Sequence, residues 1–341
     1  MLDTLRTLCA LNGVSGDEAE VRDYIINRAG KHVDDIFTDV MGNIIIMKKG
    51  AKTPAKKTVL CAHMDEVGVT ITNITDDGYL KFAAAGGVDA RVIVGKTLII
   101  GKQQVFGVIG CKAMHLVKER DRERAVAVEE LYIDIGAKDC TEAEKLVRPG
   151  DSGAFDSEIR EFGDGYIKAK AIDDRFGCAV LLRLIESDLP IDCGFVFSVQ
   201  EEVGLRGAYT AAFRAAPDIA LIVEGTTCAD LPSAPDNKKI CKIGDGAVIP
   251  FMDGATIYDR ELYGMLTELA DKNGIKWQTK TVIASGTDAA AFQRSRAGVR
   301  TAGIAAPVRN LHSQSCVAKW SDMEAVYELA RLFLEELSVM A

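Results

Sequence analysis

The spacing of apolar residues divides the chain into three parts with different secondary structure. In the first part, apolar positions recur on one helical face over residues 21–29, and residues 15–18 have the spacing of a capping box. The continuous apolar run 58–62 predicts a buried strand that leads into His63. We therefore expect a helix packed on a sheet that is covered on both faces.

Short β-rich runs separated by Gly-rich turns occupy the middle part, from residue 67 to residue 167. These runs cover residues 67–74, 79–83, 92–94, 97–100, 105–109 and 131–135. Few segments between them favour a helix. Strands at such close spacing predict a small barrel or sandwich rather than βαβ units.

Beyond residue 167 the strand and helix patterns alternate again. The last helix is expected to open with a capping box at residues 321–324 and to run to about residue 339. The sequence thus predicts an α/β domain formed by residues 1–66 and 168–341, interrupted by an inserted β domain at residues 67–167.

Charge and composition exclude several functional classes. The formal net charge is -9, and no basic face is visible, so we expect no nucleic-acid partner. No apolar stretch approaches about 18 residues, so we expect no membrane insertion. The nine cysteines form no CxxC pair, and their odd number fits reduced thiols in the cytoplasm better than a disulfide framework.

Acidic and histidine side chains stand where the predicted buried strands end. In open α/β sheets this edge is where functional sites form. The residues in question are His63, Asp65, Asp173, Asp174, Glu201, Glu202, Glu224 and His312.

Each of these residues also has a plain structural interpretation. A lone histidine after a strand is often only hydrogen bonded. Asp173 or Asp174 fits a helix N-cap. Glu201 and Glu202 could be two solvated glutamates, although adjacent carboxylates after a buried strand are unfavourable unless a cation lies beside them.

The set as a whole predicts a site for two divalent ions with nitrogen and oxygen ligands. Neighbouring glutamates at a strand end point in different directions, so one could bind metal while the other moves a proton. We find no GxSxG elbow, no GxxxxGK[ST] loop and no GxGxxG after a strand.

With these residues in view, the chain resembles the cytosolic dinuclear metallo-aminopeptidases, a family that includes glutamyl aminopeptidase, tetrahedral aminopeptidases and cellulase M. The resemblance spans nearly the whole chain. Its motifs are AHMDEVG at residues 62–68, GGVDARVIVGK at 86–96, AIDDRFGC at 171–178, QEEVGLRGA at 200–208, SGTDAAAFQRSRAGV at 285–299 and NLHSQS at 310–315.

The resemblance implies a mixed-sheet α/β/α metallopeptidase domain with an inserted small β-barrel, and a pair of metal ions, zinc or cobalt, with manganese as a further option. Asp173 would bridge the two ions. His63 and Glu224 would complete one coordination sphere, and Glu202 and His312 the other.

The same resemblance assigns catalytic roles. Glu201 would be the general base in the removal of N-terminal residues from peptides. Asp65 would orient His63, and the peptide bond between Asp173 and Asp174 is expected to be cis.

Two positions depart from the family pattern. Glu224 stands where aspartate is common, and Asn310 stands where we expect tyrosine. Neither departure removes a type of ligand. Both bear on metal preference and on the fit of the substrate.

The resemblance further implies that the inserted domain pairs subunits into dimers that build a hollow dodecamer. Two other functions fit parts of the sequence. Paired carboxylates also serve glycoside hydrolases, although aromatic residues make up only 6% of the chain. A catalytically silent peptide-binding or scaffold protein is the other alternative.

Overall fold

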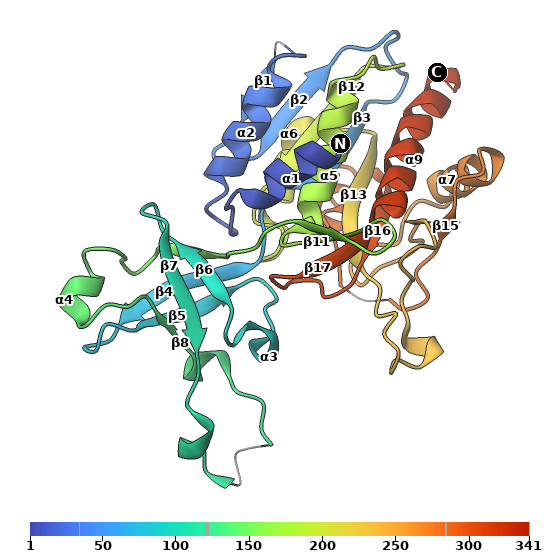
Figure 1. Ribbon diagram of the computed structural model, residues 1–341. Coiled ribbons are helices and arrows are strands. Elements are labelled where there is room, and N and C mark those ends of the chain that lie inside the picture. The colour runs from blue at the N-terminus through green and yellow to red at the C-terminus, as the bar shows by residue number, and fades with distance from the viewer. Residues whose placement is uncertain (34, 120–122, 284, 341) are drawn as a thin grey trace.

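An eight-stranded mixed sheet forms the centre of the α/β part of the molecule (Figure 1). The computed structural model describes residues 1–33, 35–119, 123–283 and 285–340. The strands follow the order β1 (Ile36–Thr38), β2 (Ile44–Lys48), β12 (Cys193–Ser198), β3 (Thr58–His63), β13 (Ile219–Thr227), β16 (Arg300–Val308), β14 (Ala247–Val248) and β15 (Trp277–Gln278). The central strands β12, β3, β13 and β16 are parallel neighbours, so their carboxyl ends meet at one edge of the sheet.

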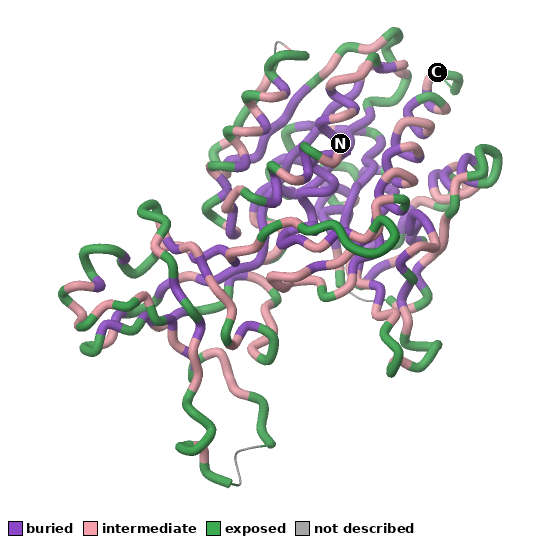
Figure 2. Tube along the Cα trace, viewed as in Figure 1, coloured by how far each residue is buried: buried purple, intermediate pink, exposed green. Residues whose placement is uncertain are grey.

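Helices cover both faces of this sheet. One apolar core joins the sheet to α1 (Leu2–Ala10), α2 (Ala19–Ala29), α5 (Ile172–Ile185), α7 (Arg260–Lys272) and α9 (Trp320–Val339). A second core on the other face contains α6 (Arg206–Ala215) and α8 (Ala289–Gln293). Buried residues accordingly follow the strands and the inner helix faces (Figure 2). The predicted α/β/α architecture is confirmed.

A closed six-stranded barrel accounts for most of the middle part of the chain. Its strands pair in the order β4 (Gly68–Ile74), β5 (Leu80–Ala85), β8 (Tyr132–Asp134), β7 (Val105–Gly110), β6 (Thr97–Ile100) and β9 (Ser152–Phe155). Leu80, Leu98 and Ile133 are fully buried in a core of its own. The barrel, rather than the sandwich, is therefore the correct alternative. Short helices in this part are α3 (Ala90–Ile93), η1 (Met114–Leu116), η3 (Val128–Glu130) and α4 (Cys140–Ala143).

A small antiparallel sheet lies where the chain passes from the barrel back to the α/β part. It consists of β10 (Arg160–Phe162), β11 (Tyr166–Ala169) and β17 (Cys316–Lys319). The short helix η4 (Asp236–Lys238) lies in a later loop. Among the helices that the structure describes, none is both long and apolar enough to cross a membrane.

One predicted strand of the middle part is wrong. Residues 92–94 have β-branched side chains, but the structure places a helical turn, α3, over most of this run. The Asp89 side chain accepts a hydrogen bond of 2.9 Å from the Arg91 backbone N–H. This N-cap favours the helical turn over the weak β propensity of three residues.

Both predicted capping boxes are also wrong. Helix α2 begins after Glu18 without a side-chain cap, because Glu18 Oε1 accepts from the backbone N–H groups of Gly16 and Gln200 instead. Helix α9 already begins at Trp320, one residue before Ser321, so that serine lies inside the helix.

Candidate metal centre and active-site pocket

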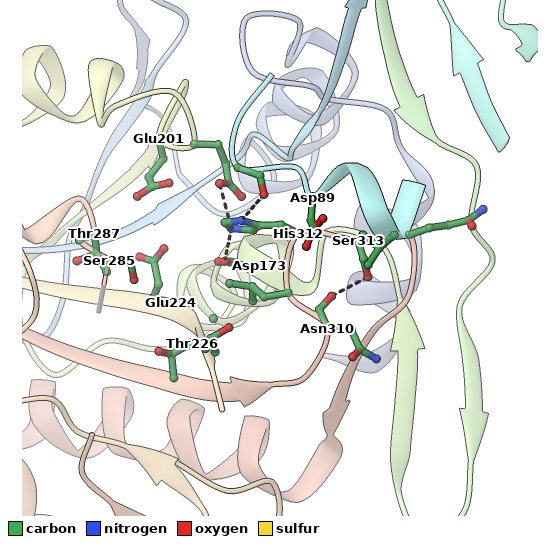
Figure 3. Close-up of a pocket in the computed structure, with 18 of the residues that line it drawn as sticks. Asp89, Asp173, Glu201, Glu224, Thr226, Ser285, Thr287, Asn310, His312 and Ser313 are labelled. Atoms are coloured by element: carbon green, nitrogen blue, oxygen red, sulfur yellow. Dashed lines mark hydrogen bonds and ion pairs between the residues drawn. The ribbon is translucent and has the colours of Figure 1, made fainter. Parts of the chain in front are cut away.

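Neighbouring parallel strands bring the predicted site residues to one edge of the sheet. His63 is the last residue of β3, and Glu201 and Glu202 follow β12. Glu224 lies inside β13 rather than after it, because that strand continues to Thr227. His312 follows β16, so segments far apart in the sequence converge (Figure 3).

His63, Asp173 and Glu224 form the first group of possible metal ligands. The Nε2 atom of His63 lies 3.3 Å from Asp173 Oδ1 and 3.3 Å from Glu224 Oε1. All three residues are buried. Glu224 Oε2 is buried without a hydrogen-bond partner among the described residues, as expected of an oxygen that needs a cation.

Asp173, Glu202 and His312 form the second group. His312 Nε2 lies 3.1 Å from Glu202 Oε2 and 3.9 Å from Asp173 Oδ2. One carboxylate therefore faces both histidines, with Oδ1 toward His63 and Oδ2 toward His312. This is the arrangement expected of a carboxylate that bridges two ions. Figure 3 shows Asp173 beside His312.

The donor atoms fit divalent metal ions. Nitrogen and oxygen ligands about 2.1 Å from one tetrahedral ion are roughly 3.4 Å apart, close to the separations around His63. Burial raises the pKa of Glu202 well above its usual range, and the nearby Asp173 charge adds to this. Burial likewise raises the pKa of Glu224 to about 7. Bound cations would relieve both penalties.

Asp65 connects the ligands and the glutamate pair. Its backbone oxygen and its Oδ1 lie 3.1 Å and 3.4 Å from His63 Nδ1. Its carboxylate also accepts from the backbone N–H groups of Glu201, at 2.9 Å, and Glu202, at 3.1 Å. Asp65 thus leaves Nε2 of His63 to face the site and fixes the backbone of both glutamates.

The side chains of Asp173 and Asp174 have different partners. Asp174 Oδ1 accepts from the Gly177 N–H at 2.9 Å, so it caps the regular part of α5. Asp173 faces the two ligand groups instead. The peptide bond between these residues is cis, which confirms the prediction.

Glu201 lies beside the ligands without belonging to either group. Its Oε2 is 4.0 Å from His63 Nε2. Burial raises the pKa of Glu201 well above its usual range. A carboxylate with a raised pKa is suited to accept and return a proton.

The inserted barrel contributes directly to the second ligand group. The loop between β5 and α3 places the Gly87 carbonyl oxygen 3.2 Å from His312 Nδ1. Gly86, at φ 86°, adopts a conformation that favours glycine, and a Cβ there would lie 3.3 Å from the Glu202 Cβ. The motif at residues 86–96 supported the resemblance, but no role for these glycines was predicted.

Asp288 is a second residue of the site region without a predicted role. It is buried, and its Oδ2 accepts from the Ser198 hydroxyl. Its Oδ1 has no partner among the described residues. Burial raises the pKa of Asp288 to about 6. Its place in the motif at residues 285–299 was the available indication.

A pocket of about 1100 Å³ opens over the two ligand groups. Asp173, Glu201 and Glu224 line its floor, and the Asn310 loop forms one side (Figure 3). Its size suits a short peptide or another small molecule.

Comparison with known proteins decides the family. The model of the family described as M42 glutamyl aminopeptidase matches residues 42–329. The chain belongs to the M42 family. It is therefore a peptidase with a divalent-metal site, and the predicted class of enzyme is confirmed.

Two relatives resemble this M42 peptidase over nearly their full length. A protein of Acetivibrio thermocellus is 38% identical over 331 residues, which cover 96% of this chain and 97% of the relative. The lysyl aminopeptidase of Pyrococcus furiosus is 32% identical over 339 residues, which cover 96% and 95%.

Two solved peptidase structures share the whole fold. An aminopeptidase from Desulfurococcus kamchatkensis superposes with a TM-score of 0.92 at 33% identity and covers 98% of this chain and 94% of its own. The TET1 peptidase of Pyrococcus horikoshii gives a TM-score of 0.85 at 34% identity, with coverages of 97% and 98%, and can assemble into a tetrahedron or a large octahedral shell.

Proposed function

We propose that this M42 peptidase removes N-terminal residues from peptides with the aid of two divalent ions, and that Glu201 is its general base. The observation that carries the proposal is the Asp173 carboxylate, which faces His63 with one oxygen and His312 with the other. Glu224 would complete the first ligand group and Glu202 the second. Zinc and cobalt suit these nitrogen and oxygen donors, and manganese is a further option.

The residues around the ligands support a hydrolytic mechanism. Two bound divalent ions would supply Lewis acidity, which lowers the pKa of a water molecule and stabilises negative charge on the scissile carbonyl oxygen. Glu201 would accept the proton of that water and then donate it to the leaving amine. Asp65 accepts a hydrogen bond from the Glu201 backbone N–H and faces His63 Nδ1. It would therefore hold Glu201 and His63 in fixed positions relative to one another.

The convergence of two imidazoles on the carboxylates supports a peptidase over a glycoside hydrolase, which needs only the carboxylates. A catalytically silent scaffold would not need the free Glu201 carboxylate.

We also propose that residues 67–167 act as the dimerisation domain and that the dimers build a dodecamer in the cytoplasm. The tetrahedral assembly of one structural relative supports this proposal. Phe106 and Val108, two outward-facing residues of β7, are 53% and 37% exposed, which supports a contact surface on the barrel. The nine free cysteines fit a reducing compartment.

The test is hydrolysis of aminoacyl-anilides by the purified chain, before and after chelation and after readdition of zinc or cobalt. We expect chelation to abolish hydrolysis, because the ions activate the water. Glu201→Gln is expected to retain about two ions per chain by elemental analysis but to lose roughly 10³-fold or more in kcat. Retained turnover in this variant would remove Glu201 from the role of base, and hydrolysis that survives chelation would contradict the metal mechanism.

A further inference from the structure

Lys96 is a cation in the wall that the inserted barrel contributes to the active-site pocket. It lines the pocket and is half-buried. Its backbone is fixed on both sides, because its N–H donates to the Ile93 carbonyl at 3.0 Å and its carbonyl accepts from the Ile109 N–H at 2.9 Å. An ordered segment between α3 and β6 therefore holds Lys96 at the pocket.

No partner for the Lys96 ammonium is found in the part of the chain that the structure describes. The ammonium makes no hydrogen bond there, and no carboxylate there lies within ion-pair distance. Arg91 in the same wall differs, because its Nε lies 3.0 Å from both carboxylate oxygens of Asp89. The other carboxylates that line the pocket are the proposed ligands and the proposed base. Since the walls of a cleft strengthen the attraction between a fixed charge and its counter-ion, an anion from outside the chain would stabilise Lys96.

The pocket wall is continuous from the second ligand group to Lys96. His312 is followed by Ser313 and Gln314, which also line the pocket. Gln314 Nε2 donates to Thr97 Oγ1, next to Lys96, at 3.1 Å. Figure 3 shows Ser313 on the side of His312 that faces away from the proposed base. A substrate that extends from the ligand groups along this wall would therefore approach Lys96.

The length of this wall suits a short peptide. The Cα atoms of His312 and Gln314 are two residues apart and thus separated by at most about 7 Å, and the hydrogen bond from Gln314 brings Lys96 close to the end of that step. An extended peptide of three or four residues spans about 10–14 Å. With its first residue at the ligand groups, its last residue would come within reach of the long Lys96 side chain.

We propose that Lys96 binds the C-terminal carboxylate of short peptide substrates, so that the enzyme favours tripeptides and tetrapeptides with a free C-terminus. This inference rests on the proposed aminopeptidase function. The terminal carboxylate is the anion that such a peptide always carries at its far end. It would provide the missing counter-charge through a charge-assisted hydrogen bond, which is stronger than a neutral one.

The experiment measures kcat/KM of the zinc- or cobalt-loaded enzyme for pairs of peptides that differ only in a free or an amidated C-terminus. Each peptide begins with the residue that is cleaved fastest as an anilide and continues with alanines. For the tripeptide and the tetrapeptide, kcat/KM of the free form is expected to exceed that of the amide about tenfold, the lower end of the range for a hydrogen bond to a charged group. For a peptide of about eight residues the ratio should be near one, because its carboxylate lies beyond Lys96.

Variants of Lys96 test the contact directly. Lys96→Met is expected to lower the tripeptide ratio of free to amidated kcat/KM to less than about twofold, Lys96→Arg to keep it, and Lys96→Glu to favour the amide. Lys102→Met is the matched control. Lys102 is exposed, does not line the pocket and follows β6, whereas Lys96 precedes that strand. It removes the same charge from the other end of β6 and should leave the ratio unchanged, because solvent screens a surface charge.

The outcomes separate this inference from the function on which it rests. A wild-type tripeptide ratio near one, or an unchanged ratio in folded Lys96→Met, would overturn the role of Lys96 alone. So would an amidated tripeptide with glutamate as its third residue that is cleaved as well as the free tripeptide, because Lys96 would then bind a side-chain carboxylate. Absence of hydrolysis of every anilide and peptide by the metal-loaded wild type would contradict the aminopeptidase proposal itself and the inference with it. Should Lys96→Met not fold, the reversal expected for Lys96→Glu and the rescue by Lys96→Arg decide the question.

Discussion

Asp65 lies in neither group of possible ligands, yet it contacts His63 and accepts hydrogen bonds from the backbone N–H groups of Glu201 and Glu202. We predict that Asp65→Ala lowers kcat/KM by about 10- to 100-fold, the usual effect of removing a residue that orients a metal ligand. The measurement is anilide hydrolysis at saturating metal, together with metal titration.

Ser15→Ala provides the comparison, because Ser15 Oγ donates to Asp65 Oδ2 at 2.6 Å without contacting the ligands. This variant removes one support of the carboxylate and should reduce kcat/KM far less. An Asp65→Ala enzyme as active as the Ser15→Ala enzyme would show that Asp65 does not orient the site.

Gly87 offers a second test at the residue scale, because a Cβ there would lie 3.1 Å from His312 Nδ1. We predict that Gly87→Ala displaces His312 and lowers the metal content from about two ions to about one per chain, since the added Cβ would meet His312 but would have no atom of His63 or Glu224 within 4 Å. Elemental analysis after dialysis measures the metal content. Gly264→Ala in α7, where an added Cβ meets nothing within 4 Å, should retain both ions; equal metal content in the two variants would exclude the proposed displacement.

Single residues were predictable where their chemistry was unusual for their position. Glu201 and Glu202 stand out as adjacent charges after a buried strand. Gly87 does not, because its contribution is a backbone carbonyl. The left-handed backbone conformations of Gln200, at φ 55°, and His312, at φ 56°, could not be predicted from the sequence either. Such strain at functional sites is imposed by the surrounding fold.

At the scale of elements, Glu66 joins α5 to the strand end that carries His63. Its Oε1 lies 2.7 Å from Lys170 Nζ and 3.2 Å from Arg175 Nη2, and all three side chains are buried. We predict that Glu66→Ala lowers the free energy of unfolding by about 3–5 kcal/mol, because it leaves two buried cations without their carboxylate. Urea denaturation followed by circular dichroism measures the loss.

Glu158→Ala is the control for this prediction, because Glu158 pairs with Arg160 on the surface, where its side chain is 74% exposed. A surface pair contributes at most about 1 kcal/mol. Similar urea midpoints for the Glu66 and Glu158 variants would mean that the buried cluster does not stabilise the fold.

Elements with a clear local pattern were predictable, and those defined by distant pairing were not. The largely apolar runs of β3 and β12 indicated buried strands, and both strands are buried at every position. The sheet formed by β10, β11 and β17 was not predicted, because Ile167 pairs with Ala318 and no local pattern marks such a distant partner. The barrel closes by similar non-local pairing, which is why spacing alone could not separate it from a sandwich.

At the scale of the whole molecule, the proposed assembly depends on exposed apolar residues of the barrel. Phe106 and Val108 alternate with buried residues along β7, so they form part of the outer surface of the barrel rather than its core. Exposed apolar side chains gathered on one face indicate a protein contact. Scattering of the full chain should therefore report about twelve times the chain mass of 36.8 kDa.

Phe106→Glu tests which surface carries the contact. A carboxylate in a subunit interface is desolvated without a partner, so this variant should shift the scattering mass from the assembly toward the single chain while the melting curve stays cooperative. Val339→Glu, at a position 71% exposed near the end of α9, introduces the same charge away from the barrel and should leave the mass unchanged. A wild type that is monomeric at every concentration would contradict the assembly. Dissociation by Val339→Glu but not by Phe106→Glu would instead indicate that the subunit contact lies on the α/β part and not on the barrel.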